Sequence, residues 1–155
     1  MTSTRNGIKY LPARWIDVAA DAETVHGIAH EVMVGGHYTR SGDVVDGVAV
    51  YEHGTQWREY WFDVLNIDLV LQLMGRPNGW GRIVVFTEPA DAATRVTISL
   101  TDGLQQRRNV RTLTAALIDT LTQRGILIAT SEPFWSMDLP KDSPGQPYPS
   151  RLKKR

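Results

Sequence analysis

The stretch from residue 82 to residue 130 constrains the fold most, because its periodicity is the clearest in the chain. From Arg95 to Thr101, Val96, Ile98 and Leu100 alternate with threonine and serine. This period of two is typical of a strand with one face buried and the other in water. An apolar run at 83–86 and a loop containing Pro89 precede it. We therefore expect a second strand before this one, joined to it through that loop.

A helix should follow this strand, because apolar residues then recur at helical spacing. Asn109 is placed to cap its start, and Gly125 follows Arg124 where a left-handed residue would end it. The expected buried stripe consists of Val110, Leu113, Ala116, Leu117 and Leu121. The apolar run at 126–128 predicts a closing strand.

The N-terminal part of the chain predicts one strand and one helix. Residues 8–18 are strand-like, but Pro12 lacks the amide donor of a central strand, which favours an edge strand or a strand after an irregular arm. Asp21 is the expected cap of a helix that ends at Gly35 and Gly36. Its stripe is Val25, Ile28, Ala29, Val32 and Met33.

The middle of the chain permits two interpretations. Residues 48–52 are β-prone, and the aromatic residues of 57–64 favour a second strand that completes a hairpin. The same aromatic residues also fit one long helix over 56–74. Under both interpretations we expect residues 66–74 to be helical.

This order of elements predicts an α+β fold. Hairpins with returning helices favour a two-layer sandwich whose mostly antiparallel sheet has about five or six strands, with two longer helices and one short helix. The first six elements have a ferredoxin-like order. We expect a single α+β domain over residues 1–137 and a Pro-rich, basic C-terminal tail over residues 138–155.

The composition and the motifs that the sequence lacks argue against several classes of function. The 17 basic and 17 acidic residues cancel, so no global field draws the chain to nucleic acid or to a membrane. The absence of cysteine excludes disulfides, thiolate metal sites and a cysteine nucleophile. No phosphate-binding loop or serine elbow is present, and no run approaches the roughly 18 apolar residues of a membrane span. We therefore expect a cytoplasmic protein without a cofactor or a membrane partner. The missing motifs weigh against the common enzyme classes but do not exclude rarer ones.

Large aromatic side chains suggest a contact surface instead. The expected strand over 57–64 carries aromatic side chains on both faces, and their apolar surface is larger than one sheet face can bury. Exposed aromatic side chains commonly anchor protein contacts. The expected partner-binding residues are Trp57, Tyr60, Trp61, Phe62, Trp80 and Trp135. The leading hypothesis is a protein-interaction or assembly module, by analogy an accessory or viral protein, with a protein partner or a homo-oligomer. The alternative is that the tail covers the second face, with Phe134 and Trp135 as the plug.

A second hypothesis is nucleic-acid binding. Basic side chains gather at the start of the long helix and at the C-terminus, where together they would contact phosphates. These residues are Arg107, Arg108, Arg111, Arg151, Lys153, Lys154 and Arg155.

A third hypothesis is a metal-binding domain or hydrolase. His26 and His30 are four residues apart on the expected first helix, a spacing that can hold a metal ion, and His37 follows. The spacing is similar to that of a zinc-protease helix, but Gly27 stands where that family places its catalytic glutamate. The alternative is that His26 and His30 lie on the polar side of the helix.

Overall fold

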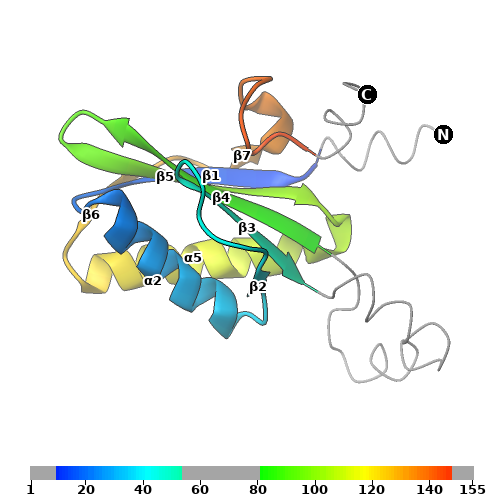
Figure 1. The fold of residues 1–155 in the computed structure, drawn as a ribbon, viewed down its shortest axis with the longest axis horizontal. Helices are drawn as coiled ribbons and strands as arrows, with labels where there is room; N and C mark the ends of the chain where they lie inside the picture. Colours follow the sequence, from blue (N-terminus) through cyan, green and yellow to red (C-terminus); the bar gives the residue numbers. More distant parts are fainter. Residues whose placement is uncertain (1–9, 54–80, 148–155) are drawn as a thin grey trace, which may run out of the picture.

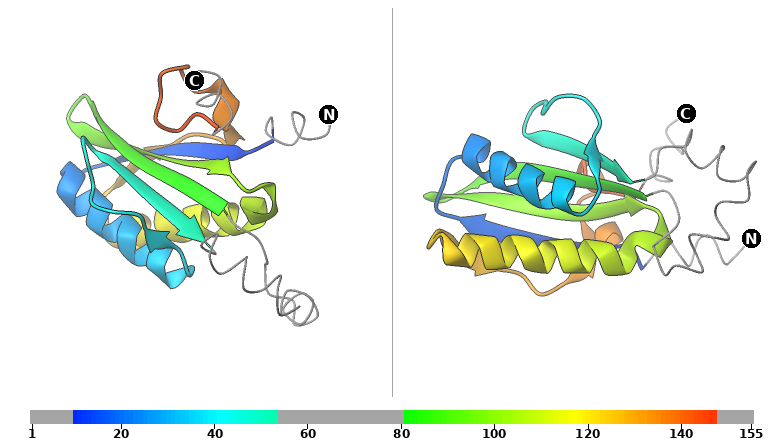
Figure 2. Two further views of the ribbon diagram at one scale, coloured as in Figure 1. Left: turned by 45° about the vertical axis from the view of Figure 1, so that its right-hand side comes forward. Right: turned by 90° about the horizontal axis from the view of Figure 1, so that it is seen from below.

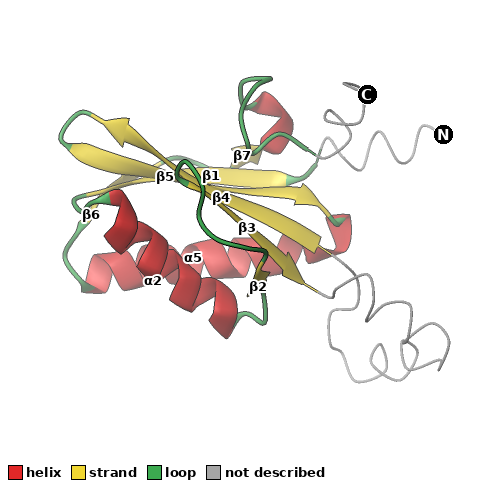
Figure 3. Cartoon of the chain, viewed as in Figure 1, coloured by secondary structure: helices red, strands yellow, loops and turns green. Residues whose placement is uncertain are grey.

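The described strands form one antiparallel sheet, and the two α-helices of the described residues pack against one of its faces (Figures 1 and 3). A computed structural model describes residues 10–53 and 81–147. In chain order the elements are β1 (Pro12–Val18), α2 (Ala22–Gly35), β2 (Thr39–Arg40), β3 (Val48–His53), β4 (Gly81–Ala90), β5 (Ala93–Asp102), η1 (Leu104–Gln106), α5 (Arg107–Gln123), β6 (Leu127–Thr130), β7 (Phe134–Trp135) and η2 (Ser136–Asp138). The predicted α+β class is confirmed. The hairpin or helix expected over 56–74 lies outside the described residues.

The sheet order is β2-β3-β4-β5-β1-β6, with β7 also paired to β1. Four adjacent strands of this order are β4, β5, β1 and β6. With β2 and β3 set aside, these strands and the helices α2 and α5 follow one another along the chain as β-α-β-β-α-β. This is the ferredoxin-like split arrangement. It extends along the chain to β6 rather than being confined to the first part, and β2 and β3 widen the sheet beyond β4.

The β4–β5 hairpin is the longest pairing, and it is longer than the sequence predicts. Ala90 pairs with Ala93, so the loop shrinks to Asp91 and Ala92, and Asp91 adopts a positive φ of 52°. Pro89 is therefore inside β4, opposite Thr94, and not in a loop.

Helix α2 is capped as predicted. The Asp21 carboxylate accepts a 2.7 Å hydrogen bond from the backbone amide of Thr24, and the helix ends at Gly36. Hydrogen bonding to the side chain of Thr24, followed by that to its backbone amide, lowers the pKa of Asp21, because both favour the charged carboxylate. The predicted stripe is buried apart from Val32, which is half-buried.

The start of α5 differs from the prediction. The helix begins at Arg107 after a 3₁₀ turn, with Gln106 at the capping position, so Asn109 lies inside the first turn. The Asn109 side chain donates to Gln106 Oε1 at 2.9 Å, and Tyr38 donates its hydroxyl to the same oxygen at 2.8 Å. Tertiary burial of Gln106 therefore decides where the helix starts. Gly125, with a φ of 72°, ends it as predicted.

Strand β1 is central, so the edge-strand alternative is wrong. The strand begins at Pro12, and Tyr10 and Leu11 precede it without strand structure, as the alternative of an irregular arm expects. It pairs with β5 on one side and with β6 and β7 on the other. Pro12 is tolerated because it is the first residue of the strand, where a missing amide donor interrupts little of the ladder.

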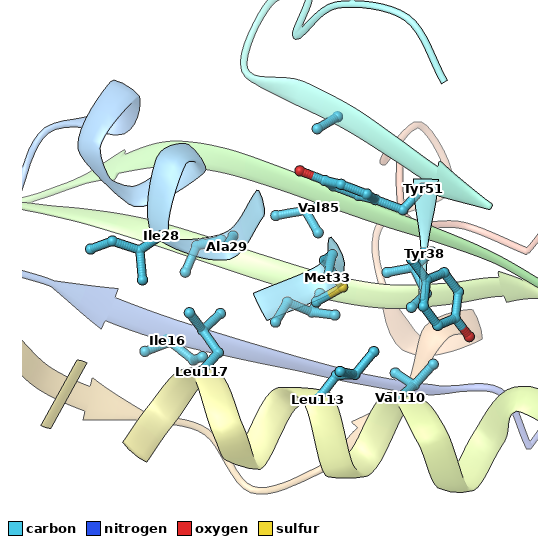
Figure 4. Packing of buried hydrophobic residues seen from close by; sticks show 14 of the residues in the cluster. Ile16, Ile28, Ala29, Met33, Tyr38, Tyr51, Val85, Val110, Leu113 and Leu117 are labelled. Atoms are coloured by element: carbon cyan, nitrogen blue, oxygen red, sulfur yellow. The ribbon is translucent and has the colours of Figure 1, made fainter. Parts of the chain in front are cut away.

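The main core lies between the sheet and the helices (Figure 4). Strand residues such as Ile16 and Val85 meet Ala29 and Met33 of α2 and Leu117 of α5. Ala116, expected in the stripe of α5, is exposed, and Thr114 is buried instead. The side chain of Thr114 donates to the Val110 carbonyl at 2.7 Å, which allows its burial.

At β5 the second face of the sheet, opposite the helices, is buried. Thr97, Ser99 and Thr101 are all buried, so the expectation of a wet face is wrong. The segment that follows β7 lies on this face, opposite the helices (Figure 1). Ser99 Oγ is 2.7 Å from Ser136 Oγ and 2.6 Å from the Gly145 carbonyl oxygen. Part of the expected tail therefore covers the sheet, whereas its basic end at 148–155 lies outside the described residues.

A polar cluster occupies the same face nearer the β4–β5 turn. The Arg95 guanidinium makes two hydrogen bonds to the Asp17 carboxylate, at 2.8 and 3.0 Å, and lies 3.9 Å above the Trp15 ring. The hydrogen bond to Asp17 raises the pKa of Arg95. The cluster joins β1 to β5. Among the described helices, none combines the length and the apolar character that a bilayer crossing requires.

The packing of Gly145 gives a direct test of the covered second face. A Cβ at Gly145 would lie 2.7 Å from Leu139 Cδ1, 2.9 Å from Phe86 Cε1 and 3.0 Å from Ser99 Cβ. We expect Gly145→Ala to lower the free energy of unfolding by about 1–3 kcal/mol, because the site is already filled. Chemical denaturation measures this change.

Gly27→Ala is the matched control. Its Cβ would meet nothing within 4 Å, and the position is inside a helix. This variant should gain about 0.5–1 kcal/mol. Equal effects of the two substitutions would mean that residues 139–145 do not pack on the sheet.

Candidate functional site

A pocket of about 140 Å³ lies where the start of β1 meets the first turns of α5. Figure 2 shows that both elements begin at the same end of the molecule. The lining residues are Pro12, Ala13, Arg14, Ile98, Val110, Arg111, Thr114 and Pro133. The walls are thus mostly apolar, with two arginines among them.

The pocket is next to a break in the pairing along β1. Thr130 of β6 pairs with Ile16, and Phe134 of β7 pairs with Ala13. Residues 131–133 connect these two pairings, and Pro133 contributes to the pocket. If β6 and β7 were one continuous strand, residues 131–133 would be paired with β1 as well.

Arg14 is half-buried and held by one of its nitrogens. Its Nε donates to the Ser131 carbonyl at 2.8 Å and to Thr130 Oγ1 at 3.1 Å. Within residues 10–53 and 81–147 the structure records no hydrogen bond or ion pair of its two terminal Nη groups. The side chain is therefore oriented while the bidentate end of the guanidinium stays available.

Arg111 lines the other side of the pocket, and Arg107 and Arg108 lie one turn before it on α5. All three are exposed. None of them forms an ion pair within the described part of the chain. Together with Arg14 they concentrate positive charge at the start of a helix, which itself favours anions.

An exposed aromatic pair lies at the same end of β1. Tyr10 precedes the strand, and Trp135 of β7 is opposite Pro12 in the ladder. The two rings meet edge to face, with centroids 5.5 Å apart, and remain 48% and 37% exposed. Met137, two residues further on, is 46% exposed. We call Tyr10, Trp135 and Met137 the aromatic surface.

The fold thus brings together part of the predicted residues. Trp135, Arg107, Arg108 and Arg111 lie at the end of the molecule where β1 and α5 begin. The other predicted residues, Trp57, Tyr60, Trp61, Phe62, Trp80, Arg151, Lys153, Lys154 and Arg155, lie outside the described residues. Sequence reasoning missed Arg14 and Tyr10, because neither carries a motif and only strand pairing places them beside Pro133 and Trp135.

His26 points into the protein instead of outward. It is 7% exposed, and its Nε2 lies 3.0 Å from the Gly47 carbonyl oxygen and 3.2 Å from Thr87 Oγ1. A carbonyl oxygen can only accept, so Nε2 carries the proton. Nδ1 is buried and has no hydrogen-bond partner in the described structure. Burial lowers the pKa of His26, with a smaller contribution from the charge of Arg40.

His30 and His37 do not join His26 in a metal site. His30 Nδ1 lies 3.2 Å from the Tyr51 hydroxyl, and the two rings are 5.8 Å apart. His37 follows the helix end with a positive φ of 68° and is exposed. Among the described residues no three histidine, aspartate or glutamate side chains gather closely enough to hold a metal ion. The described geometry therefore gives the metal hypothesis no support.

Comparison of the sequence with protein families and with curated proteins finds no match in either. Function must therefore be argued from the geometry at this end of the molecule.

The buried imidazole of His26 makes stability depend on pH. Because its pKa in the folded state is lower than the ordinary value of 6.5, the unfolded chain binds more protons as the pH falls. We expect the free energy of unfolding to decrease below about pH 6.5. Denaturation curves between about pH 8 and pH 5 measure this loss.

His26→Gln keeps an amide donor for the Gly47 carbonyl and removes the titrating group. This variant should lose less stability than the parent protein over the same pH range. The same loss in both proteins would show that His26 is not responsible.

Proposed function

We propose that the protein is a non-enzymatic binding module that self-associates through the aromatic surface. The supporting observation is the exposed, edge-to-face pair of Tyr10 and Trp135. Tryptophan, tyrosine and methionine are enriched in protein interfaces, and each buried aromatic ring removes about 150–250 Å² from water. The aromatic residues of 57–62 and Trp80 remain predicted partner-binding residues.

A second copy of the chain is the proposed partner for two reasons. The formal net charge is zero, so identical copies do not repel one another over long distances. A two-fold axis would also place each aromatic surface against the same surface of the other copy. A cytoplasmic location and an accessory role, cellular or viral, stay predictions from the sequence.

Sedimentation velocity over a range of protein concentrations tests self-association. We expect the weight-average mass to rise toward that of a dimer as concentration increases. Trp135→Ser should weaken association at least about tenfold, because central aromatic residues commonly contribute most of the binding free energy.

Val45→Ser is the matched control, since Val45 is 64% exposed but lies in the loop before β3. It should associate like the parent protein. A monomer at every soluble concentration, or equal weakening by both substitutions, would contradict the proposal.

A second candidate function is binding of single-stranded nucleic acid. The observation that favours it is the group of Arg14, Arg107, Arg108 and Arg111, which form no ion pairs among the described residues. Exposed aromatic rings at the same end would supply stacking surfaces for bases. The predicted residues Arg151, Lys153, Lys154 and Arg155 would extend this basic surface.

Titration of a fluorescent single-stranded oligonucleotide at several salt concentrations tests this candidate. Each phosphate contact should contribute about 0.7 to the slope of log affinity against log salt. Arg107→Gln should reduce the slope by roughly one contact, whereas Arg124→Gln, at the other end of α5, should not. Absence of binding at low salt would rule out this function.

A further inference from the structure

The pocket beneath α5 combines an apolar floor with two arginines. Its floor is apolar, with Ile98 and Val110 almost fully buried. Arg14 and Arg111 are also among its lining residues, and the described structure records no ion pair for either. Two like charges beside one apolar pocket repel each other, so the arrangement favours an anion between them.

Among the polar side chains that line the pocket, only the arginines have N–H groups left to bind an anion. Thr114 donates its hydroxyl to the Val110 carbonyl, so it has no second proton to offer. The Nε of Arg14 is held by Ser131 and Thr130, which leaves its Nη groups as donors. A guanidinium presents parallel N–H groups that match the two oxygens of a carboxylate.

The volume of the pocket limits the size of the apolar part of the ligand. At about 140 Å³ the pocket is close in size to an apolar cavity of about 150 Å³ that holds one benzene ring. It is too small for a base with its sugar. A free inorganic phosphate would satisfy the arginines but would leave the apolar walls unfilled.

We propose that this pocket binds a small carboxylate with an apolar body, such as one aromatic ring or a short alkyl chain. The body occupies the space between Pro12, Ile98 and Val110, and the carboxylate lies between Arg14 and Arg111. This site is separate from the aromatic surface and does not depend on self-association.

Benzoate and hexanoate are the probes, and the neutral benzamide is the comparison compound. Titration of the full chain is followed by shifts of backbone amide resonances. We expect saturable shifts at Arg14, Val110, Arg111 and Thr114 with at least one of the two carboxylates. Benzamide should bind at least about tenfold more weakly, because it lacks the charge that the arginines recognise.

Arg111→Gln should weaken binding about five- to tenfold, since it removes one of the two guanidiniums while leaving the apolar walls in place. Arg108→Gln is the matched control, because Arg108 is exposed on the same helix but does not line the pocket. It should bind like the parent protein. Trp135→Ser should also bind normally, which separates this site from the proposed self-association.

Failure of both carboxylates to shift these resonances would overturn the proposal. Equal binding of benzoate and benzamide, or equal weakening by Arg111→Gln and Arg108→Gln, would overturn it as well. If inorganic phosphate binds more tightly than both carboxylates, the site is a simple anion site and the proposed apolar recognition is wrong.

Discussion

Burial of β5 on both faces is the constraint on which the rest of the structure depends. On one face Val96, Ile98 and Leu100 pack beneath the helices. On the other face the Ser99 hydroxyl meets Ser136 and the Gly145 carbonyl. A buried hydroxyl is tolerated only when it is hydrogen-bonded, so this strand requires the C-terminal segment to lie on it.

That requirement also positions the candidate site. Ser136 Oγ is 2.9 Å from the Leu100 carbonyl oxygen and 3.2 Å from that of Pro12, which holds the segment against the start of β1. Trp135 and Pro133 precede this anchor by one and three residues. Their placement beside Tyr10 and the pocket is therefore a consequence of packing on the second face. The exposed rings and the arginines gather there because three distant segments of the chain meet at one end.

Buried polar groups determine structural details, such as the start of α5, that the hydrophobic period of the sequence does not predict. Gln106 is fully buried and accepts hydrogen bonds from Tyr38 and Asn109, and an added Cβ on Gly81 would clash with its side chain. This cluster links the start of α5 to β4 and to the loop after α2. His26 similarly joins α2 to Gly47 and Thr87. Imidazoles four residues apart resemble a metal site in sequence, but here each one meets the sheet or its loops.

The sequence alone determined the α+β class, the ends of α2, the stop of α5 at Gly125 and most of the apolar stripes. These features depend on local backbone preference and on a hydrophobic period, which are properties of a few neighbouring residues. The central place of β1, the start of α5 at Arg107 and the burial of Thr97, Ser99 and Thr101 were decided only by the tertiary structure. So was the grouping of Arg14 with Arg111 and of Tyr10 with Trp135. Each of these depends on contacts between residues far apart in the chain, and no local pattern encodes which distant segment will cover a given face.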